Sequence, residues 1–314
     1  MTQVFIDGSA GTTGLRIRER LSARSDLSLL VLPEELRKDP SARRDALNRA
    51  DVVFLCLPDD AAREAASMVE NPDTVVIDTS TAHRVSPDWI YGMPELPGQR
   101  ERISSARRIA NPGCHATGFI LLAAPLVARG IIPASASLSC FSLTGYSGGG
   151  KKMIAEYEAA ERDPLLDAPR MYGLSQQHKH LPEMRKYAGL ESDPVFCPIV
   201  APYYAGMEVV LPLSGEICSA SLKDLLEIYA AFYAPAPGMD FSRVPVRVTD
   251  AAEGGFLSAG FHAGRDDLSI GVFGAEGRLT AVARFDNLGK GASGAAIQNM
   301  NLALGLDETT GLVI

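Results

Sequence analysis

One cysteine and two neighbouring histidines are the residues of this 314-residue chain best suited to chemistry. Cys114 stands in the run Asn111-Pro-Gly-Cys-His-Ala-Thr-Gly118, between a strand-like run at 107–110 and an apolar helical run at 119–128. A helix N-terminus favours a thiolate, because its unpaired N–H groups and the helix dipole stabilise negative charge. The same N–H groups suit a developing oxyanion. The run therefore predicts a nucleophile, with a buried cysteine that only caps the helix as the alternative.

The histidines lie in the run Gln177-His-Lys-His-Leu-Pro-Glu-Met184, where Glu183 follows His180 by three residues. Histidine is the side chain best placed to move protons near neutral pH, and a nearby carboxylate can orient its ring. This spacing makes His178 and His180 candidates for a general acid or base. Two alternatives stay open. One is a zinc site, which lacks an obvious third ligand, and the other is that the histidines only cap the helix that Pro182 and Glu183 begin.

A glycine-rich turn near the start of the chain, Gly8-Ser-Ala-Gly-Thr-Thr-Gly14, follows a short apolar strand at 3–7 and precedes a helix at 11–23. Such a turn lets the backbone approach a pyrophosphate at the helix N-terminus, although an ordinary tight turn would look the same. Further apolar strands at 27–32, 51–57 and 74–78 alternate with helices at 41–48 and 60–69. This alternation predicts a parallel sheet covered on both faces, and hence a dinucleotide-binding fold.

Charged residues follow two of these strands. The second strand is followed by Glu34, Glu35, Arg37 and Lys38; an acid there suits a free ribose 2′-OH and a base suits a 2′-phosphate, so the choice stays open. The fourth leads to Arg84, which can bind an anionic group in fork geometry or lie on the surface. The stretch 89–97 is predicted to be an irregular loop.

The second half of the chain has a different pattern. A strand at 135–143 leads into Thr144-Gly-Tyr-Ser-Gly-Gly-Gly-Lys-Lys152 and then a helix at 153–161. Glycines and lysines at the start of a helix can bind a phosphate group, and the alternative is a plain linker. Strands at 195–200, 207–213, 244–249, 269–273 and 279–285 with a helix at 221–233 predict a mostly antiparallel α+β domain. A glycine turn and a helix of small residues close the chain at 286–301.

Composition limits the class of protein. The chain is 46% hydrophobic and 22% charged, with a net charge of −8, which is ordinary for a globular protein with a substantial core. No basic block suggests nucleic acid, and no apolar run approaches the ~20 residues that span a bilayer. The five cysteines show no metal-binding spacing. With no signal-type start, they suit free thiols, so we expect a cytoplasmic protein without a metal.

Taken together, five motifs in order make the chain resemble the N-acetyl-γ-glutamyl-phosphate reductase family of arginine biosynthesis, in its shorter form. They are GSAGTTG at 8–14, NPGCHATG at 111–118, TGYSGGGKK at 144–152, HKHLPEM at 178–184 and DNLGKGASGAAIQNMN at 286–301. The resemblance runs nearly end to end and is far more specific than any single motif. It implies NADP-dependent reduction of an acyl phosphate to an aldehyde through a cysteine thioester.

The resemblance also implies an α/β fold like that of glyceraldehyde-3-phosphate dehydrogenase. A Rossmann NADP-binding domain is expected at 1–113 and 287–314, and an α+β catalytic and oligomerisation domain at 114–286. The expected catalytic residues are Cys114, His178, His180 and Glu183. The cofactor candidates are Gly8, Ser9, Gly11, Thr12, Gly14, Arg37, Ser80, Ser147, Gly148, Asn287 and Lys290, and the substrate candidates are Arg84, Asn111 and Lys151.

Two other functions compete with this interpretation. A related acyl-phosphate reductase, of the aspartate-semialdehyde or N-acetyl-aminoadipate type, would differ only in the contacts of its substrate pocket. A nucleotide-binding regulatory protein with a dead site would keep the first glycine motif but need neither Cys114 nor the histidines. The expected partners are a small-molecule acyl phosphate and further copies of the chain, as a homodimer or homotetramer.

Overall fold

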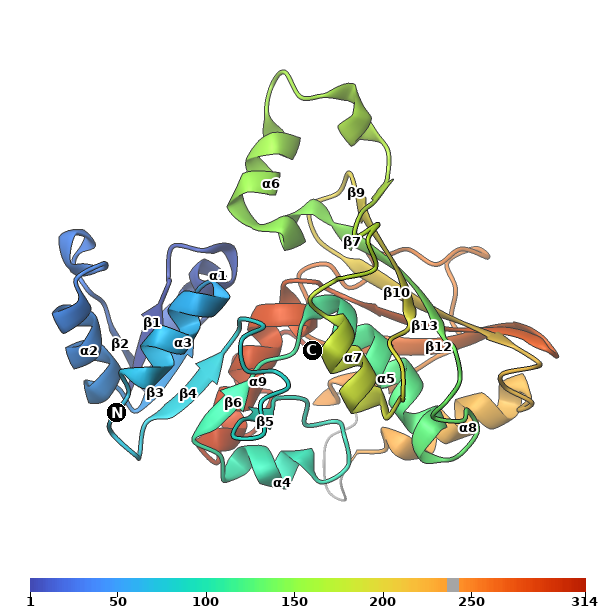
Figure 1. Ribbon diagram of the computed structural model, residues 1–314, viewed down its shortest axis with the longest axis horizontal. Helices are drawn as coiled ribbons and strands as arrows, with labels where there is room; N and C mark the ends of the chain where they lie inside the picture. Colours follow the sequence, from blue (N-terminus) through green and yellow to red (C-terminus); the bar gives the residue numbers. More distant parts are fainter. Residues whose placement is uncertain (236–242) are drawn as a thin grey trace. The chain divides into compact units, whose positions relative to one another are not determined.

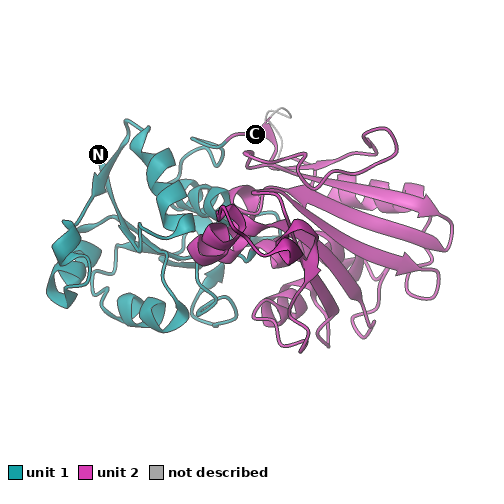
Figure 2. Cartoon of the chain, turned by 90° about the horizontal axis from the view of Figure 1, so that it is seen from above, with its two compact units in different colours: residues 1–113, 292–312 teal, residues 114–291, 313–314 magenta. Residues whose placement is uncertain are grey.

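A computed structural model of the chain describes residues 1–235 and 243–314, which form two compact units. The first unit contains Met1–Gly113 and Ala292–Leu312, and the second contains Cys114–Gly291 and Val313–Ile314 (Figure 2). The chain returns to the first unit at Ala292, after the boundary at 287 that was expected from the sequence.

The first unit is built on a parallel sheet with strand order β2-β1-β3-β4-β6-β5 among the described residues (Figure 1). Every strand pair in it is parallel, as the alternation of strands and helices predicted. The strands are β1 (Thr2–Asp7), β2 (Leu27–Leu30), β3 (Val52–Leu55), β4 (Val75–Asp78), β5 (Ile90–Tyr91) and β6 (Arg108–Ala110).

Helices cover both faces of this sheet because the central strands are apolar on both sides. One core joins the sheet to Ile17, Ile103 and Ile297 of α1, α4 and α9, and the other joins it to Leu47 and Ala65 of α2 and α3. The helices are α1 (Thr12–Ser22), α2 (Pro40–Arg49), α3 (Asp59–Ser67), α4 (Gln99–Ser104) and α9 (Gly294–Ala303). The predicted irregular loop at 89–97 is wrong in part, because it contains β5, a two-residue edge strand too short to show a periodic pattern.

The second unit is built on a mixed sheet with strand order β11-β12-β13-β10-β7-β9-β8. The β7–β9 and β11–β12 pairs are parallel and the other pairs are antiparallel, so the prediction of a mostly antiparallel sheet is confirmed. The strands are β7 (Ser139–Gly145), β8 (Arg170–Met171), β9 (Val195–Ala201), β10 (Met207–Ser214), β11 (Val246–Val248), β12 (Leu268–Ala275) and β13 (Arg278–Phe285).

Helix α5 (Cys114–Ala128) is the central helix of the second unit, and it packs on β10 and β13. Its residues from His115 to Leu126 are buried. Pro125 has no N–H, so the carbonyl of Leu121, four residues earlier, lacks its usual helical donor. Tyr233 supplies a hydroxyl donor to that carbonyl at 2.6 Å. The helix therefore keeps its backbone satisfied inside the core.

The remaining helices of the second unit are α6 (Gly150–Glu158), α7 (Leu181–Ala188) and α8 (Leu222–Phe232). Helix α7 packs against α5, and α8 packs against β12. Short turns of other helical types occur at Tyr146–Gly149, Pro164–Asp167 and Gly289–Ser293. Among the described residues, no helix is both long and apolar enough to cross a membrane.

Candidate active site and nucleotide pocket

Cys114 is the first residue of α5, at the junction of turn and helix that the sequence predicted. Its side chain is half-buried, whereas the residues on either side of it are buried. A Cβ atom on Gly291 would lie only 2.9 Å from the Cβ of Cys114, so the turn at Gly289–Ser293 can pack this closely only with glycine at that position. The glycine motif near the end of the chain thus forms one wall beside Cys114.

His115 is buried next to Cys114, and both of its ring nitrogens are hydrogen-bonded. Nδ1 lies 2.7 Å from Ser142 Oγ, and Nε2 lies 2.6 Å from the hydroxyl of Tyr172. Burial, together with the smaller effect of the charges of His178 and Lys179, lowers the pKa of His115 from 6.5 to about 3. The ring is therefore neutral at physiological pH.

His178 and His180 lie in the same aromatic cluster as His115. The ring of His115 is 5.8 Å from that of His178 and 5.6 Å from that of His180, measured between ring centroids. His180 is the N-cap residue of α7, but its side chain makes no capping hydrogen bond. This argues against the alternative that the pair only caps the helix. Glu183 is buried in the first turn of α7.

The histidine pair differs in exposure and in local bonding. His178 is half-buried, and its Nδ1 accepts a hydrogen bond from the backbone N–H of His180 at 3.2 Å. A neutral His178 therefore carries its hydrogen on Nε2. His180 is only 5% exposed.

Gln176 fixes the loop that carries the histidines to strand β9. Its side-chain amide donates to the carbonyl of Phe196 at 2.7 Å and accepts from the N–H of the same residue at 2.9 Å. The ring of Phe196 in turn lies against His115 and His178, with centroid distances of 5.2 and 5.0 Å. The loop is thus held by both backbone and ring contacts.

Two glycine-rich motifs of the second unit meet at Asn287. Its side-chain amide donates to Ser147 Oγ at 3.0 Å and accepts from the N–H of Gly206 at 2.9 Å. A Cβ on Gly148 would lie 3.4 Å from the same amide. The structure therefore brings Ser147, Gly148 and Asn287 together, with Asn287 engaged in the turn. Lys290 is buried in the adjoining Gly289–Ser293 turn.

The glycine motif of the first unit has the geometry of a phosphate cradle. Gly8 has φ +87°, and a Cβ there would lie 2.2 Å from the carbonyl oxygen of Cys56. A Cβ on Gly14 would lie 2.5 Å from the carbonyl oxygen of Gly8. Only glycine permits this approach of strand and helix. The hydroxyl of Thr12, in the first turn of α1, is buried with no hydrogen-bond partner among the described residues.

No acidic residue lies in the first turn of α1, and Gly11, its N-cap, makes no side-chain capping bond. The N–H groups of this turn, together with the hydroxyl of Thr12, fit an anion such as the pyrophosphate of a dinucleotide. Asp7, the one acid at the end of β1, is paired with Arg43 at 2.8 Å. The cradle is therefore not opposed by an uncompensated carboxylate of that strand.

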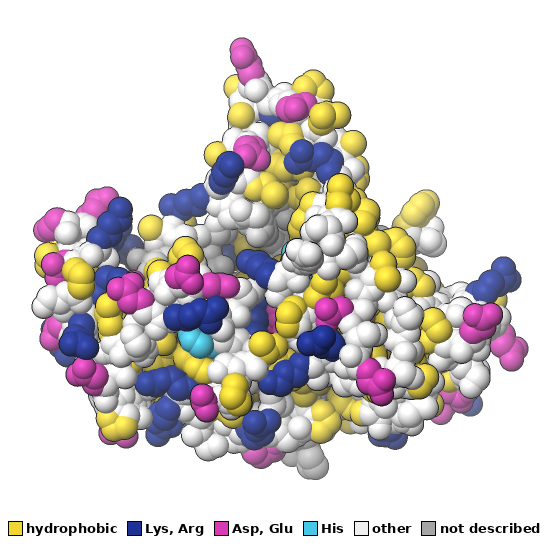
Figure 3. Space-filling model, viewed as in Figure 1, with side chains coloured by type: hydrophobic (Ala, Val, Ile, Leu, Met, Phe, Trp, Pro, Cys, Tyr) yellow, Lys and Arg dark blue, Asp and Glu magenta, His cyan; other side chains and the backbone are white. Residues whose placement is uncertain are grey.

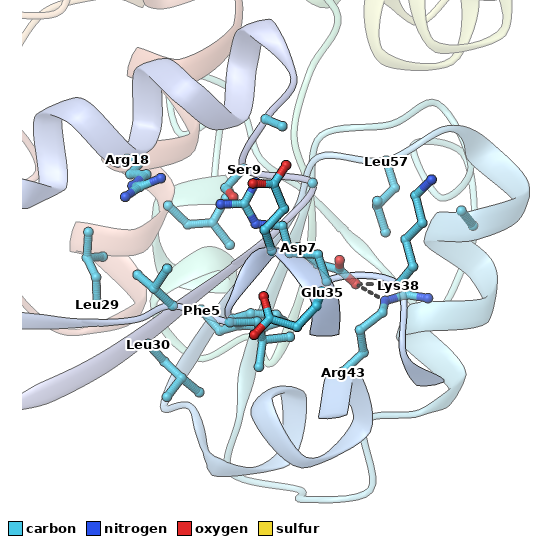
Figure 4. Close-up of a pocket in the computed structure, with 18 residues that line it drawn as sticks. Phe5, Asp7, Ser9, Arg18, Leu29, Leu30, Glu35, Lys38, Arg43 and Leu57 are labelled. Atoms are coloured by element: carbon cyan, nitrogen blue, oxygen red, sulfur yellow. Dashed lines mark hydrogen bonds and ion pairs between the residues drawn. The ribbon is translucent and has the colours of Figure 1, made fainter. Parts of the chain in front are cut away.

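A pocket of about 650 Å³ opens beside this cradle, within the first unit (Figure 4). The ends of β1 and β2 form its apolar side, and Ser9 lines it with its glycine neighbour. Charged side chains form the rest. They are Asp7, Arg18, Glu34, Glu35, Arg37, Lys38 and Arg43. Asp7 and Arg43 pair with each other, which leaves the acids Glu34 and Glu35 and three basic side chains. These three, Arg18, Arg37 and Lys38, form no side-chain ion pair among the described residues.

Three other predicted site residues take part in the framework of the first unit. The hydroxyl of Ser80 donates to Asp78 at 2.8 Å. Arg84 is buried and donates to the backbone carbonyls of Asn111 and Thr79, at 2.9 and 3.0 Å. The amide of Asn111 donates to the carbonyl of Ala292 at 3.1 Å and accepts from Asn299. These bonds hold the ends of β4 and β6 together. Lys151, in α6 of the second unit, is exposed.

The sequence analysis missed Ser142, Tyr172 and Gln176. Ser142 was part of a predicted strand, and the other two preceded the histidine motif without any recognisable spacing. His115 was visible only as the neighbour of Cys114. An alternation in β7 that puts a serine on the buried side is the one local signal that could have marked Ser142.

Comparison with known proteins agrees with this arrangement. A family model described as semialdehyde dehydrogenase, NAD binding domain, matches residues 3–106, and one described as semialdehyde dehydrogenase, dimerisation domain, matches residues 114–287. The N-acetyl-gamma-glutamyl-phosphate reductases of Brucella ovis and Brucella melitensis are each 46% identical to this chain over 308 residues, covering 96% of it and 99% of the relative. The chain belongs to the N-acetyl-gamma-glutamyl-phosphate reductase family. The resemblance inferred from five motifs is thereby confirmed.

Solved structures of more distant semialdehyde dehydrogenases share the fold of this reductase family member. Aspartate semialdehyde dehydrogenase II from Vibrio cholerae, complexed with ASA, superposes with a TM-score of 0.71 at 16% identity, covering 97% of this chain and 98% of that one. The enzyme from Candida albicans with NADP gives a TM-score of 0.66 at 16% identity, covering 97% and 99%. The predicted fold class, a Rossmann domain followed by an α+β domain, is confirmed.

The neutral, buried ring of His115 predicts a pH dependence of stability. Between about pH 6.5 and pH 3 the unfolded chain binds one proton that the folded chain does not, so the free energy of unfolding falls as the pH falls. At its steepest this contributes about 1.4 kcal/mol per pH unit. Urea titrations across this range should give a shallower pH slope for His115→Gln than for the native chain. Equal slopes would contradict a neutral His115.

Proposed function

We propose that this chain reduces N-acetyl-γ-glutamyl phosphate to N-acetylglutamate 5-semialdehyde and phosphate, with NADPH as reductant and Cys114 as nucleophile. Membership of the reductase family and the position of Cys114 at the start of α5 support this proposal. The half-buried thiol stands at a helix N-terminus, where N–H groups favour a thiolate and a developing oxyanion. His115, the next residue in α5, lies in one aromatic cluster with His178, His180 and Phe196.

In the proposed reaction the Cys114 sulfur attacks the acyl carbon, the C–O bond to phosphate breaks, and a thioester forms on the cysteine. The mixed anhydride is already activated, so this step needs a good nucleophile and an oxyanion site more than it needs acid catalysis. When bound, NADPH supplies the hydride for the reduction. The exposed ammonium of Lys151 is the proposed partner of the departing phosphate.

Proton transfer falls to His178 or His180. One of them protonates the thiohemiacetal oxygen on Cys114 and later removes that proton, so that the C–S bond breaks and the aldehyde leaves. The buried carboxyl of Glu183, in the helix that His180 caps, supports a role in orienting that pair. His115 is excluded from this role because its depressed pKa keeps it neutral near physiological pH.

The first experiment follows NADP⁺ reduction with N-acetylglutamate semialdehyde and phosphate, for the native chain and for Cys114→Ala. Activity should require phosphate and vanish in the variant, because only the thiolate can form the acyl-enzyme. Undiminished activity of Cys114→Ala would contradict the mechanism. Activity only with an aspartate or N-acetyl-aminoadipate semialdehyde would keep the mechanism and replace the substrate.

We propose NADP rather than NAD as the cofactor. The support is the excess of bases around the pocket of the first unit, which is lined by three bases that are unpaired among the described residues and by two glutamates. Figure 4 draws Arg18 and Lys38 on different sides of this pocket. A 2′-phosphate gains charge-assisted hydrogen bonds from such cations, whereas a free 2′-OH needs only an acceptor.

Arg37→Ala tests this choice. The KM for NADPH should rise about tenfold, and the KM for NADH should change little, because only NADPH carries the 2′-phosphate. Glu34→Gln is the matched control, since it removes a charge of opposite sign from the same rim and should not weaken NADPH binding. An equal rise for both nucleotides would argue for a role of Arg37 in general nucleotide binding instead.

We also propose that the chain forms a homodimer through the face of the second sheet that points away from α5 and α8. Phe141, Cys197 and Val210 lie opposite one another on this face, across β7, β9 and β10. Phe141 is 42% exposed, and Met171 and Val195 on neighbouring strands are 44% and 49% exposed. Figure 3 shows hydrophobic side chains along this part of the second unit. The matched dimerisation-domain model supports a second copy as the occupant.

Phe141→Asp should convert the native species to monomers in light scattering after size exclusion, because a carboxylate in an apolar interface is left without a partner. Leu306→Asp, at a 38% exposed apolar residue of the first unit, is the control and should leave the mass unchanged. A native chain that is monomeric at micromolar concentration would contradict the proposal.

A further inference from the structure

The hydrogen bonds around His115 have a direction, and that direction can be derived from burial. Ser142 is fully buried, and among the described residues its hydroxyl has one hydrogen-bonding partner, Nδ1 of His115. A buried hydroxyl hydrogen that finds no acceptor loses the hydrogen bond it would make with water and gains nothing in return. The hydrogen of Ser142 therefore points at Nδ1, which accepts it.

The tautomer of His115 follows from this. A neutral imidazole carries one N–H, and since Nδ1 accepts, Nε2 must carry the hydrogen. Nε2 therefore donates to the hydroxyl oxygen of Tyr172, 2.6 Å away. The hydroxyl hydrogen of Tyr172 then points away from the ring. The result is a chain of donors that runs from Ser142 through His115 to Tyr172.

The sheet register fixes the two ends of this chain. Ser142 of β7 lies opposite Pro198 of β9, and the backbone N–H of Tyr172 donates to the carbonyl of the same Pro198 at 3.0 Å. Ser142 and Tyr172 are thus held at either side of His115 by neighbouring strands rather than by a free loop. Tyr172 is half-buried, so its hydroxyl is the end of the chain that a ligand can reach.

Tyr172 belongs to the ring cluster that contains His115, the residue after the nucleophile. Its ring is 5.9 Å from that of His178, and the residue it bonds to directly follows Cys114 in α5. Burial raises the pKa of Tyr172, and the charge of Cys114 raises it further. The hydroxyl therefore stays protonated near neutral pH, as a hydrogen-bond donor must.

We propose that the hydroxyl of Tyr172 is a catalytic hydrogen-bond donor to the carbonyl oxygen of the acyl group on Cys114, and that His115 and Ser142 are positioning residues which aim it. This inference rests on the proposed role of Cys114. The hydrogen bond strengthens as the carbonyl oxygen gains negative charge on attack or on hydride addition, which is the stage at which a donor lowers the barrier.

Tyr172→Phe tests the donor directly, because it removes one oxygen and keeps the ring. The kcat of the reductase should fall on the order of 10²-fold, with the KM for the acyl phosphate little changed. Tyr204→Phe is the matched control, because Tyr204 belongs to the same unit and its hydroxyl has no hydrogen bond among the described residues. The kcat of this variant should equal that of the native chain.

Ser142→Ala tests the direction of the chain. Without the serine hydrogen the His115 ring can adopt its other tautomer and accept a hydrogen bond from Tyr172. The kcat should then fall about tenfold, even though the fully buried Ser142 cannot touch the substrate. Ser142→Thr keeps a hydroxyl and should restore most of kcat. In the Tyr172→Phe background Ser142→Ala should have no further effect on kcat, because the donor that Ser142 helps to aim is then absent.

Three results would overturn the inference. Native-like kcat in Tyr172→Phe, with Cys114→Ser inactive, would remove Tyr172 from the reaction and leave the proposed function standing. An equal loss of kcat from Ser142→Ala in both backgrounds would mean that Ser142 acts on structure alone. Activity in Cys114→Ser would overturn the proposed function together with this inference.

Discussion

The burial of α5 is the constraint on which the second unit depends. The helix is enclosed from His115 to Leu126, so its position cannot shift without breaking contacts with β10 and β13. Pro125 leaves a carbonyl without its helical donor, and a tyrosine of α8's end satisfies it from outside. Because the helix is fixed in this way, its first residue is fixed too. Cys114 therefore stands at the N-terminus of a rigid, desolvated helix, where the first N–H groups have no partner within the helix itself.

The histidines of the second unit differ in how far they are buried. His115 lies deepest and cannot take up a proton near physiological pH, since burial and the charges of His178 and Lys179 all oppose it. A neutral ring bonded at both nitrogens donates one hydrogen bond and accepts the other. His178 is nearer to solvent and has one nitrogen bonded to backbone. The two rings therefore differ in burial and in bonding: His115 is a neutral ring bonded at both nitrogens, whereas His178 is half-buried.

The first unit solves a different problem, which is to bring backbone to within contact of a phosphate. Gly8 and Gly14 are required because any Cβ would collide with a carbonyl oxygen, so the glycine motif records a close approach of β1, β3 and α1. The ion pair with Arg43 offsets the negative charge of Asp7, which would otherwise repel an anion. Around the rim, the bases outnumber the acids that remain. The helix N-terminus, the glycines and the charge around the pocket all favour binding of an anion, and each contributes only weakly by itself.

The sequence by itself determined the order of elements, the glycine turns and the place of Cys114 at the start of a helix, because these depend on the burial pattern of neighbouring residues. It also carried enough motifs in order to identify the family. The tertiary structure alone decided which polar side chains meet. Ser142 and Tyr172 are joined to His115 across 27 and 57 residues, and Asn287 to Ser147 across 140. Such pairs depend on strand register and on the packing of distant elements, and no spacing in the chain encodes them locally. For the same reason the sequence does not show that Arg84 joins the ends of β4 and β6, or that the hydroxyl of Ser80 donates to Asp78.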